Sequence, residues 1–336
     1  MTTKEAWDGN LLIAEIGSVH DGSFGNAQKA IEAVAAAGAD AVKFQTHIAE
    51  AETLASAPNP PYFNAESRMD YFRRTGFTLN QWRQLAAHAR THKVRFLSSP
   101  FSLEAVDLLE EAGVGAYKIP SGEVANIPLL ERVAETKKPV FLSSGMSNWA
   151  ELDAAVEALR PGGPITIMQC SSAYPCPPEQ VGLNVIGEMR TRYGIDVGYS
   201  DHTMGFAAPI AAAALGAKVI EKHFTFSRLM YGSDAKHSME PTDFAVLAAA
   251  LKETWASLAC PVDKADATPY ASMKKTFEKS VVTGVAIPAG TNIERKHLAF
   301  KKPGTGINAS RYREIVGRRT RSTLPADHLL TEEDFV

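Results

Sequence analysis

The feature that most constrains the fold is a repeated pattern in which a short apolar run ends in polar or ionisable residues and a helical stretch follows. In VIEKHF (219–224), two aliphatic residues lead directly into Glu, Lys and His. Short apolar runs of this kind predict buried strands. Eight strands are predicted in this way: LLIAEI (11–16), DAVKFQ (40–45), VRFLSS (94–99), GAYKI (115–119), PVFLSS (139–144), ITIMQC (165–170), IDVGYS (195–200) and AKVIEK (217–222).

Amphipathic stretches between these runs predict helices, and their ends carry capping signals. Thr78 and Gln81 have the spacing of a capping box that opens a helix reaching to about His92. The other predicted helices span 27–37, 102–112, 127–136, 149–159, 206–215 and 241–258, and Gly38, Gly113 and Gly216 stand where helix C-caps are expected.

Eight strand–helix units predict a (β/α)8 TIM barrel. A doubly wound sheet also alternates strands and helices, but the segment after the first strand, GSVHDG (17–22), lacks the GxGxxG phosphate loop of that fold. We therefore expect a barrel over 1–258 and a polar linker over 259–275. The region 276–336, with its short strands and turns, is expected to form a small mostly-β domain.

Composition excludes several classes of protein. The net charge of −3 and the absence of a basic block argue against nucleic-acid binding, and no apolar run reaches the length of a membrane span. The first ten residues are polar, and Cys170, Cys176 and Cys260 lack metal-binding spacing. We expect free thiols in a cytoplasmic protein, with Cys170 in the core.

The active site of such a barrel lies at the carboxyl ends of its strands. Reading those ends explains why VIEKHF finishes in charges, because they would emerge at a catalytic mouth. The strand ends supply Glu15, Lys43, Gln45, Ser98, Ser99, Lys118, Ser121, Glu123, Ser143, Ser144, Gln169, Ser171, Ser172, Ser200, His202, Glu221 and His223.

Two lysines on separate strand ends with a rim of serines indicate an anionic ligand, although each lysine could instead pair with a carboxylate. His202 and His223 follow neighbouring strands and could hold a divalent ion, or one could be a general base and the other structural. Glu15 and Glu123 are candidates for acid–base chemistry or for pairing with the lysines. Asp201 could orient a histidine or cap a turn.

Several stretches of the barrel region are distinctive: AEIGSVHDG (14–22), VKFQTH (42–47), SSPFS (98–102), YKIPSGE (117–123), LSSGM (142–146), QCSSAYPCP (169–177), GYSDHTMG (198–205), IEKHFT (220–225) and GSDAKHSMEP (232–241). With these stretches the chain resembles the sialic acid synthase family. The resemblance covers nearly the whole chain, and the carboxyl-terminal KSVV, IPAGT and KKPGTGI resemble the antifreeze-like, or SAF, domain of that family.

The resemblance implies a synthase that condenses phosphoenolpyruvate with an N-acetylated hexosamine. It implies a divalent metal, Mn²⁺ or Mg²⁺, on His202 and His223, and catalytic roles for Glu15, Glu123 and Asp234. It also implies a homodimer in which the SAF domain of one subunit covers the barrel mouth of the other. The implied phosphoenolpyruvate-binding residues are Lys43, Ser99, Lys118, Ser121, Ser143, Ser172 and Ser200, and the implied sugar-binding residues are Gln45, Tyr174, Asp234 and Lys302.

Departures from the family pattern fall on the acceptor side. Lys302 stands where the family often has an arginine. The lysine keeps the positive charge but lacks the planar guanidinium that can donate two parallel hydrogen bonds. Ser18 and Val19 precede His20, where the family often has Asn, and the sequence of the loop 58–77 is particular to this chain.

The identity of the acceptor thus stays open, between N-acetylmannosamine and the modified hexoses of pseudaminic, legionaminic or spore-coat polysaccharide synthesis. The more distant alternatives are a metal-dependent aldolase that uses pyruvate, a Schiff-base aldolase with Lys118 as its lysine, and a non-catalytic sugar-binding protein. Glu123 argues against the lowered pKa that Lys118 would need in such an aldolase.

Overall fold

The computed structural model describes residue 7, residues 9–59 and residues 66–336. The polar first residues and positions 60–65 of the loop 58–77 therefore lie mostly or wholly outside the described chain. The chain divides into two compact units, Met1–Cys260 and Pro261–Val336. Each unit has an apolar core of its own.

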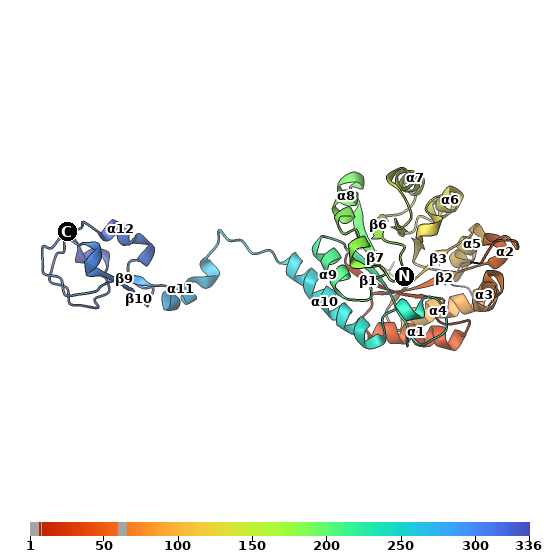
Figure 1. The fold of residues 1–336 in the computed structure, drawn as a ribbon, viewed down its shortest axis with the longest axis horizontal. Helices are drawn as coiled ribbons and strands as arrows, with labels where there is room; N and C mark the ends of the chain where they lie inside the picture. The colour runs from red at the N-terminus through yellow and green to blue at the C-terminus, as the bar shows by residue number, and fades with distance from the viewer. Residues whose placement is uncertain (1–6, 8, 60–65) are drawn as a thin grey trace, which may run out of the picture. The chain divides into compact units, whose positions relative to one another are not determined.

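The first unit is a closed barrel of eight parallel strands in chain order, which confirms the predicted TIM barrel (Figure 1). Each predicted apolar run became one strand, with ends shifted by at most two residues. The strands are β1 (Leu11–Gly17), β2 (Ala41–Thr46), β3 (Arg95–Pro100), β4 (Ala116–Ile119), β5 (Val140–Ser143), β6 (Ile165–Cys170), β7 (Asp196–Asp201) and β8 (Val219–His223).

Helices surround the strands (Figure 1), and the predicted capping box is present, because Thr78 accepts from the backbone of Gln81 and Gln81 from that of Thr78. Gly113 is a left-handed C-cap as expected. The helices of this unit are α1 (Phe24–Ala36), α2 (Ala49–Glu52), α3 (Arg68–Thr75), α4 (Leu79–Thr91), α5 (Leu103–Ala112), α6 (Ile127–Glu135), α7 (Trp149–Leu159), α8 (Asn184–Tyr193), α9 (Ala207–Ala214) and α10 (Pro241–Ala259).

Alternation along each strand separates the outside of the barrel from its inside. Residues such as Leu12, Val42 and Ile220 point outward and join the core under the helices. The inside is filled by a second cluster: Leu11, Ile13, Ala41, Leu97, Ala116, Phe141, Met168 and Val219. Because side chains repeat every two residues, the next inward positions at the carboxyl ends belong to the polar residues of the mouth.

The second unit carries a two-stranded antiparallel sheet of β9 (Ser280–Thr283) and β10 (Leu298–Lys301). Two short helices accompany it, α11 (Ala271–Phe277) and α12 (Tyr312–Ile315). Its core includes Val281, Ile293, Ile315 and Phe335. Helix α11 begins within 259–275, the segment expected to be a linker.

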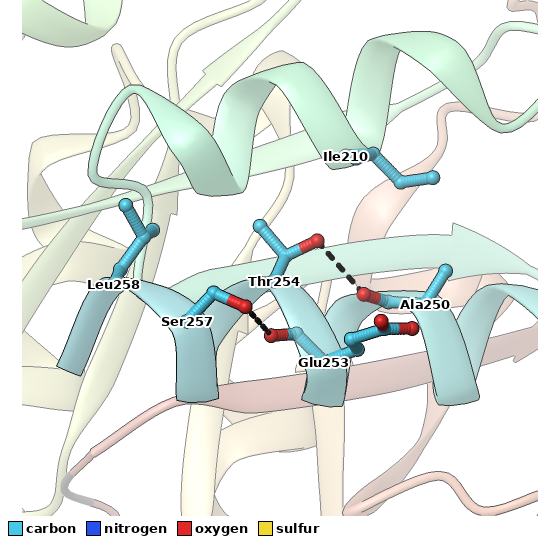
Figure 2. Close-up of a pocket in the computed structure, with 6 residues that line it drawn as sticks. All are labelled: Ile210, Ala250, Glu253, Thr254, Ser257 and Leu258. Carbon is cyan, nitrogen blue, oxygen red and sulfur yellow. Dashed lines mark hydrogen bonds between the residues drawn. The ribbon is translucent and has the colours of Figure 1, made fainter. Parts of the chain in front are cut away.

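Within the described residues, no helix combines the length and apolar character needed to cross a bilayer. A surface pocket lies between α9 and α10, on the outer ring of helices, and shares no residue with the barrel mouth (Figure 2). It is lined by Ile210, Ala250, Glu253, Thr254, Ser257 and Leu258.

Candidate active site

Strand register brings the polar strand ends together at the mouth of the barrel. Glu15 on β1 lies opposite His223 on β8 and Lys43 on β2. Ser200 on β7 lies opposite Glu221 on β8. The inward positions one step beyond the apolar cluster are Glu15, Lys43, Ser99, Lys118, Ser143, Cys170 and Glu221, all of them buried.

Four of these side chains form a buried ion cluster. Oε1 of Glu221 lies 3.2 Å from Nζ of Lys118 and 3.3 Å from Nζ of Lys43. Lys43 also lies 3.2 Å from Oε2 of Glu15. Two positive and two negative groups therefore balance one another in a place where an unpaired charge would be costly. Pairing with a carboxylate does not prevent the lysines from binding an anionic ligand, because both lysines pair with carboxylates and still face the mouth.

Burial acts on the protonation of this cluster. It raises the pKa of Glu15, an effect that Lys43 opposes and Glu221 reinforces. Burial also lowers the pKa of Lys118, although Glu221 opposes that shift. Burial alone would raise the pKa of Glu221, but Lys118 and Lys43 outweigh it and lower that pKa to about 2. Glu221 is thus the ionised carboxylate that holds both lysines, and Glu15 is the one that takes up a proton more readily.

Serine hydroxyls surround the two ammonium groups. Lys43 donates to Oγ of Ser99 at 3.3 Å, and Lys118 donates to Oγ of Ser143 at 3.0 Å. Ser200 donates to Oε1 of Glu221 at 3.1 Å. Each serine is positioned by an ionised neighbour, and the lysines and serines present donors on one side of the mouth.

A small cradle follows β5 at Gly145. The Gly145 N–H donates to Oγ of Ser121 at 3.1 Å. A Cβ on Gly145 would lie 2.5 Å from Oγ of Ser172, 2.6 Å from Oγ of Ser121 and 3.0 Å from Sγ of Cys170. The absence of a side chain at 145 therefore keeps two hydroxyls close to a backbone loop, the kind of arrangement that holds an oxyanion.

The two histidines predicted as metal ligands lie side by side, with ring centroids 5.5 Å apart. Nδ1 of His202 lies 2.8 Å from the carbonyl oxygen of Ser171, so it carries the proton and leaves Nε2 with a free lone pair. Within the described part of the chain, Nδ1 of His223 is buried without a hydrogen-bond partner, and burial lowers the pKa of His223 to about 4. Both rings are suited to bind a divalent ion. Among the described residues, however, no carboxylate or thiol completes a close three-ligand group with them.

Three of the four predicted sugar-binding residues lie beside the ion cluster or the histidine pair. Gln45 donates to Oε1 of Glu15 at 2.8 Å, and the Tyr174 ring lies 4.0 Å from that of His202. Asp234 approaches Gly17 so closely that a Cβ there would lie 2.9 Å from its Oδ2. These three residues therefore border the ion cluster or the histidine pair.

Glu123 and Lys302 are not joined to this cluster. Glu123 is half-buried and accepts from Nδ2 of Asn126 at 2.8 Å. Lys302 belongs to the second unit, where its ammonium lies 5.2 Å from the centre of the Phe277 ring. Both keep their proposed roles only from the family resemblance.

Some assignments from the sequence were wrong or incomplete. The carboxylate that faces Lys118 is Glu221, not Glu123, and burial does lower the pKa of Lys118. The sequence places Glu221 at a strand end but gives it no role. Because Glu221 is two residues before His223 on the same strand, both side chains point inward, and this spacing could have predicted its place in the cluster. Asp201 orients no histidine. It accepts from the Thr203 N–H at 2.9 Å and pairs with Lys222, the outward residue of VIEKHF.

The thiol at the site was also undervalued. All three cysteines are free, as expected, and Cys170 is buried. Its Sγ nevertheless lies 3.7 Å from Oγ of Ser121 and 3.9 Å from Nδ1 of His202. Cys170 therefore lines the site between the cradle and the histidine pair, rather than only filling the core.

Two family models match the chain. The NeuB family model matches residues 30–262, and the SAF domain model matches residues 278–336. The chain is 37% identical to N,N'-diacetyllegionaminic acid synthase of Campylobacter jejuni, over 96% of this chain and 99% of that one. It is 33% identical to N-acetylneuraminate-9-phosphate synthase of Homo sapiens, over 96% and 92%. The solved N-acetylneuraminic acid synthetase of Leptospira borgpetersenii superposes with a TM-score of 0.70 at 28% identity, covering 80% of this chain and 91% of the other.

Proposed function

Because the chain belongs to the NeuB family and carries a SAF domain, it is a phosphoenolpyruvate-dependent synthase, and we propose that its acceptor is the open-chain aldehyde of an N-acylated hexosamine. The product is then a 2-keto-3-deoxy sugar acid of nine carbons, released with inorganic phosphate. The observation that carries this proposal is the pair of buried lysines, Lys43 and Lys118, facing a barrel mouth ringed by serine hydroxyls.

Phosphoenolpyruvate brings a phosphate and a carboxylate to this mouth. Lys43 and Lys118 supply the two positive charges that such a ligand needs, and Ser99 and Ser143 are already aligned with them. The cradle at Gly145 adds the hydroxyls of Ser121 and Ser172. Ser200 donates to Glu221 here, and it would join the donor set by turning its hydroxyl towards the ligand.

The reaction forms one carbon–carbon bond and one carbon–oxygen bond, the second from water, and breaks the carbon–oxygen bond between C2 and the phosphate. C3 of phosphoenolpyruvate attacks the aldehyde carbon, and positive character develops at C2. The carboxylate of Glu15, next to Lys43, stabilises that charge. Water adds to C2, and the proton that it loses protonates the oxygen of the former aldehyde. The tetrahedral intermediate then expels inorganic phosphate, which takes the proton of the C2 hydroxyl and leaves the 2-keto group. Glu123 and Asp234 orient acceptor hydroxyls or move protons.

A divalent ion, Mn²⁺ or Mg²⁺, would be held by His202 and His223 and would polarise the acceptor carbonyl as a Lewis acid. The protonated Nδ1 of His202 and the unpartnered Nδ1 of His223 support this assignment. Gln45 and Tyr174 border the same space and would contact the acceptor.

The family likeness also supports a cytoplasmic homodimer in which the SAF domain of one subunit reaches the barrel mouth of the other. Lys302 would then meet the acyl group of the partner's acceptor. A lysine there offers a point charge in place of a planar fork, so a different or weaker contact with the acyl oxygen is expected.

The proposal is tested by phosphate release from phosphoenolpyruvate with Mn²⁺ over a panel of aldoses. The panel contains N-acetylmannosamine, its 6-phosphate, mannose and a 6-deoxy-diamino hexose. Acceptor-dependent release of phosphate, with a new 2-keto acid found by mass spectrometry, is expected for one N-acylated sugar. Equal release with mannose, or release without any acceptor, would argue against an N-acylhexosamine acceptor.

A further inference from the structure

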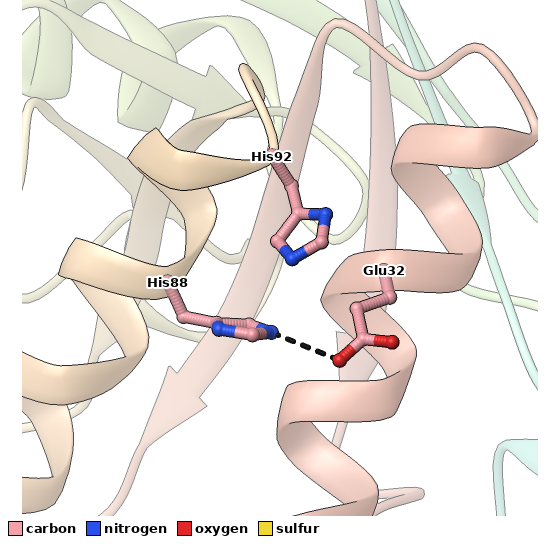
Figure 3. A group of neighbouring side chains, drawn as sticks. All are labelled: Glu32, His88 and His92. Atoms are coloured by element: carbon pink, nitrogen blue, oxygen red, sulfur yellow. Dashed lines mark hydrogen bonds and ion pairs between the residues drawn. The ribbon is translucent and has the colours of Figure 1, made fainter.

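A second group of metal-ligating side chains lies outside the barrel, away from the mouth. It consists of Glu32 on α1, His88 on α4 and His92, the C-cap residue of α4. Figure 3 shows the carboxylate and both imidazoles turned towards the space between the two helices. One possible ligand atom from each residue lies within 4.8 Å of the others, and no other such group of three was found among the described residues.

Helix geometry brings these three groups together. His88 and His92 are four residues apart and so project from one face of α4. Their ring centroids are 4.6 Å apart. Nε2 of His88 lies 3.2 Å from Oε1 of Glu32, which fixes the carboxylate from the neighbouring helix. All three side chains are half-buried, so an ion could enter from solvent without unfolding the chain.

We propose that Glu32, His88 and His92 bind a divalent transition metal ion of the zinc type, and that the ion clips α1 to α4. Two imidazoles and one carboxylate are the donors that such ions prefer, whereas Mg²⁺ prefers oxygen ligands alone. Three protein ligands leave a fourth position for water in tetrahedral geometry. The outer group differs from the histidine pair at the mouth in that a carboxylate lies close enough to serve as a third ligand.

The location of the clip indicates what it does. Helix α1 leads into β2, which carries Lys43, and α4 leads into β3, which carries Ser99. Binding an ion across α1 and α4 stabilises the folded barrel, because the unfolded chain does not hold these ligands together. None of the three residues belongs to the proposed active site, so activity with Mn²⁺ does not depend on them.

The test compares the full-length, metal-stripped wild type with the double variant Glu32→Gln/His92→Gln. Zinc at 100 times its dissociation constant for this cluster is expected to raise the Tm of the wild type by about 5 °C more than that of the double variant, whereas Mg²⁺ should shift both proteins equally. The double variant should also hold one zinc ion fewer per chain. His328→Gln is the matched control, since His328 pairs with Asp334 at 3.0 Å without a second imidazole. Unchanged zinc stoichiometry in a double variant that keeps the metal-free Tm would overturn the proposal.

Because the mouth also offers two histidines, a second measurement isolates the outer cluster. In the variant His202→Gln/His223→Gln, added Co²⁺ is expected to give the visible bands of tetrahedral nitrogen and oxygen coordination, and zinc should displace it. Adding Glu32→Gln and His92→Gln should abolish the bands. A featureless Co²⁺ spectrum in the first variant, with its fold intact by circular dichroism, contradicts the proposal regardless of the enzymatic reaction.

Discussion

Glu221 is the residue on which both lysines of the mouth depend, because one of its oxygens faces Lys43 and Lys118 at 3.3 and 3.2 Å. Glu221→Gln keeps the shape but removes the charge, so two buried ammonium groups compete for Glu15. Breaking such a buried pair costs about 3–5 kcal/mol. We expect urea unfolding to show this loss and phosphate release to fall at least about 100-fold.

Glu157→Gln is the matched control for this change. Glu157 pairs with Arg160 at the surface, and its side chain is 77% exposed. A surface substitution of this kind changes stability by no more than about 0.5 kcal/mol. If both variants were equally stable and active, the buried cluster would not have the importance assigned to it.

His20 makes the stability of the barrel depend on pH. Burial lowers its pKa to about 4, and Nδ1 accepts from the Gly22 N–H at 3.2 Å while the ring packs on Phe77. Between the unfolded pKa of 6.5 and this value, the unfolded chain binds the extra proton. Stability therefore falls as pH drops through that window, by about 2 kcal/mol from pH 7 to pH 5.

His20→Gln cannot ionise but can still accept from the Gly22 N–H. Urea unfolding at pH 7 and pH 5 should show that the difference between the two pH values is smaller in this variant by about the same 2 kcal/mol. An identical pH dependence in both proteins would show that His20 already titrates normally in the folded state.

The arrangement of hydroxyl groups beside the loop after β5 depends on the absence of a side chain at Gly145. A Cβ there would lie within 2.6 Å of the hydroxyl oxygens of Ser121 and Ser172. We expect Gly145→Ala to raise the KM for phosphoenolpyruvate about 10-fold or more by displacing these donors. Gly187→Ala in α8 is the control, because a Cβ at that position meets nothing within 4 Å. Equal KM values in both variants would show that the cradle does not hold the donor substrate.

Arg74 on α3 links three loops, one of which, 58–77, is proposed to border the acceptor. It pairs with Asp21 after β1 at 2.6 Å and with Glu66 before α3 at 2.5 Å, and Tyr231 after β8 donates to Glu66 at 3.1 Å. The pairs are partly exposed and contribute little to global stability. We expect Arg74→Gln to raise the KM for the acceptor several-fold, with the KM for phosphoenolpyruvate unchanged. Arg73→Gln removes only exposed pairs with Glu50 and Asp70 and should change neither. The reverse pattern would separate Arg74 from the acceptor.

Strands were easier to predict than the helices between them. Most positions of every barrel strand are buried, which the apolar pattern records directly. Helix α3 lay in what was predicted to be loop, because RMDYFRRT is mostly polar and buries only Tyr71 and Thr75. Helix α8 was not identified, because it buries only Ile186 and Met189 and contains Gly187. Amphipathic patterns fail where a helix has a narrow apolar face.

For the molecule as a whole, the sequence predicted which residues reach the mouth but not which of them touch. Lys118 on β4 and Glu221 on β8 are 103 positions apart, and they meet only because the closed barrel brings their inward side chains together inside it. Glu123, five positions from Lys118, is directed to Asn126 instead. A residue reaches the mouth because it lies at the carboxyl end of a strand. Which residues contact one another there depends on the register of the closed sheet.

The proposed homodimer makes a prediction about which subunit completes each site. If the SAF domain serves the partner's mouth, Glu15→Gln and Lys302→Ala damage different halves of one shared site. Each homodimer should have low activity. Co-expression in equal amounts makes half of the dimers mixed, and each mixed dimer has one site with both native residues. Activity should then recover to about a quarter of the wild type.

The comparison variant carries both substitutions on one chain and is co-expressed with the Glu15→Gln chain. Every mouth then lacks Glu15, so no arrangement of subunits can restore a complete site. Recovery in the first mixture but not in this one would show that Lys302 acts across the interface. Without recovery, and with mixed dimers found by native mass spectrometry, the SAF domain would serve its own barrel, and the acceptor site would be completed within one chain.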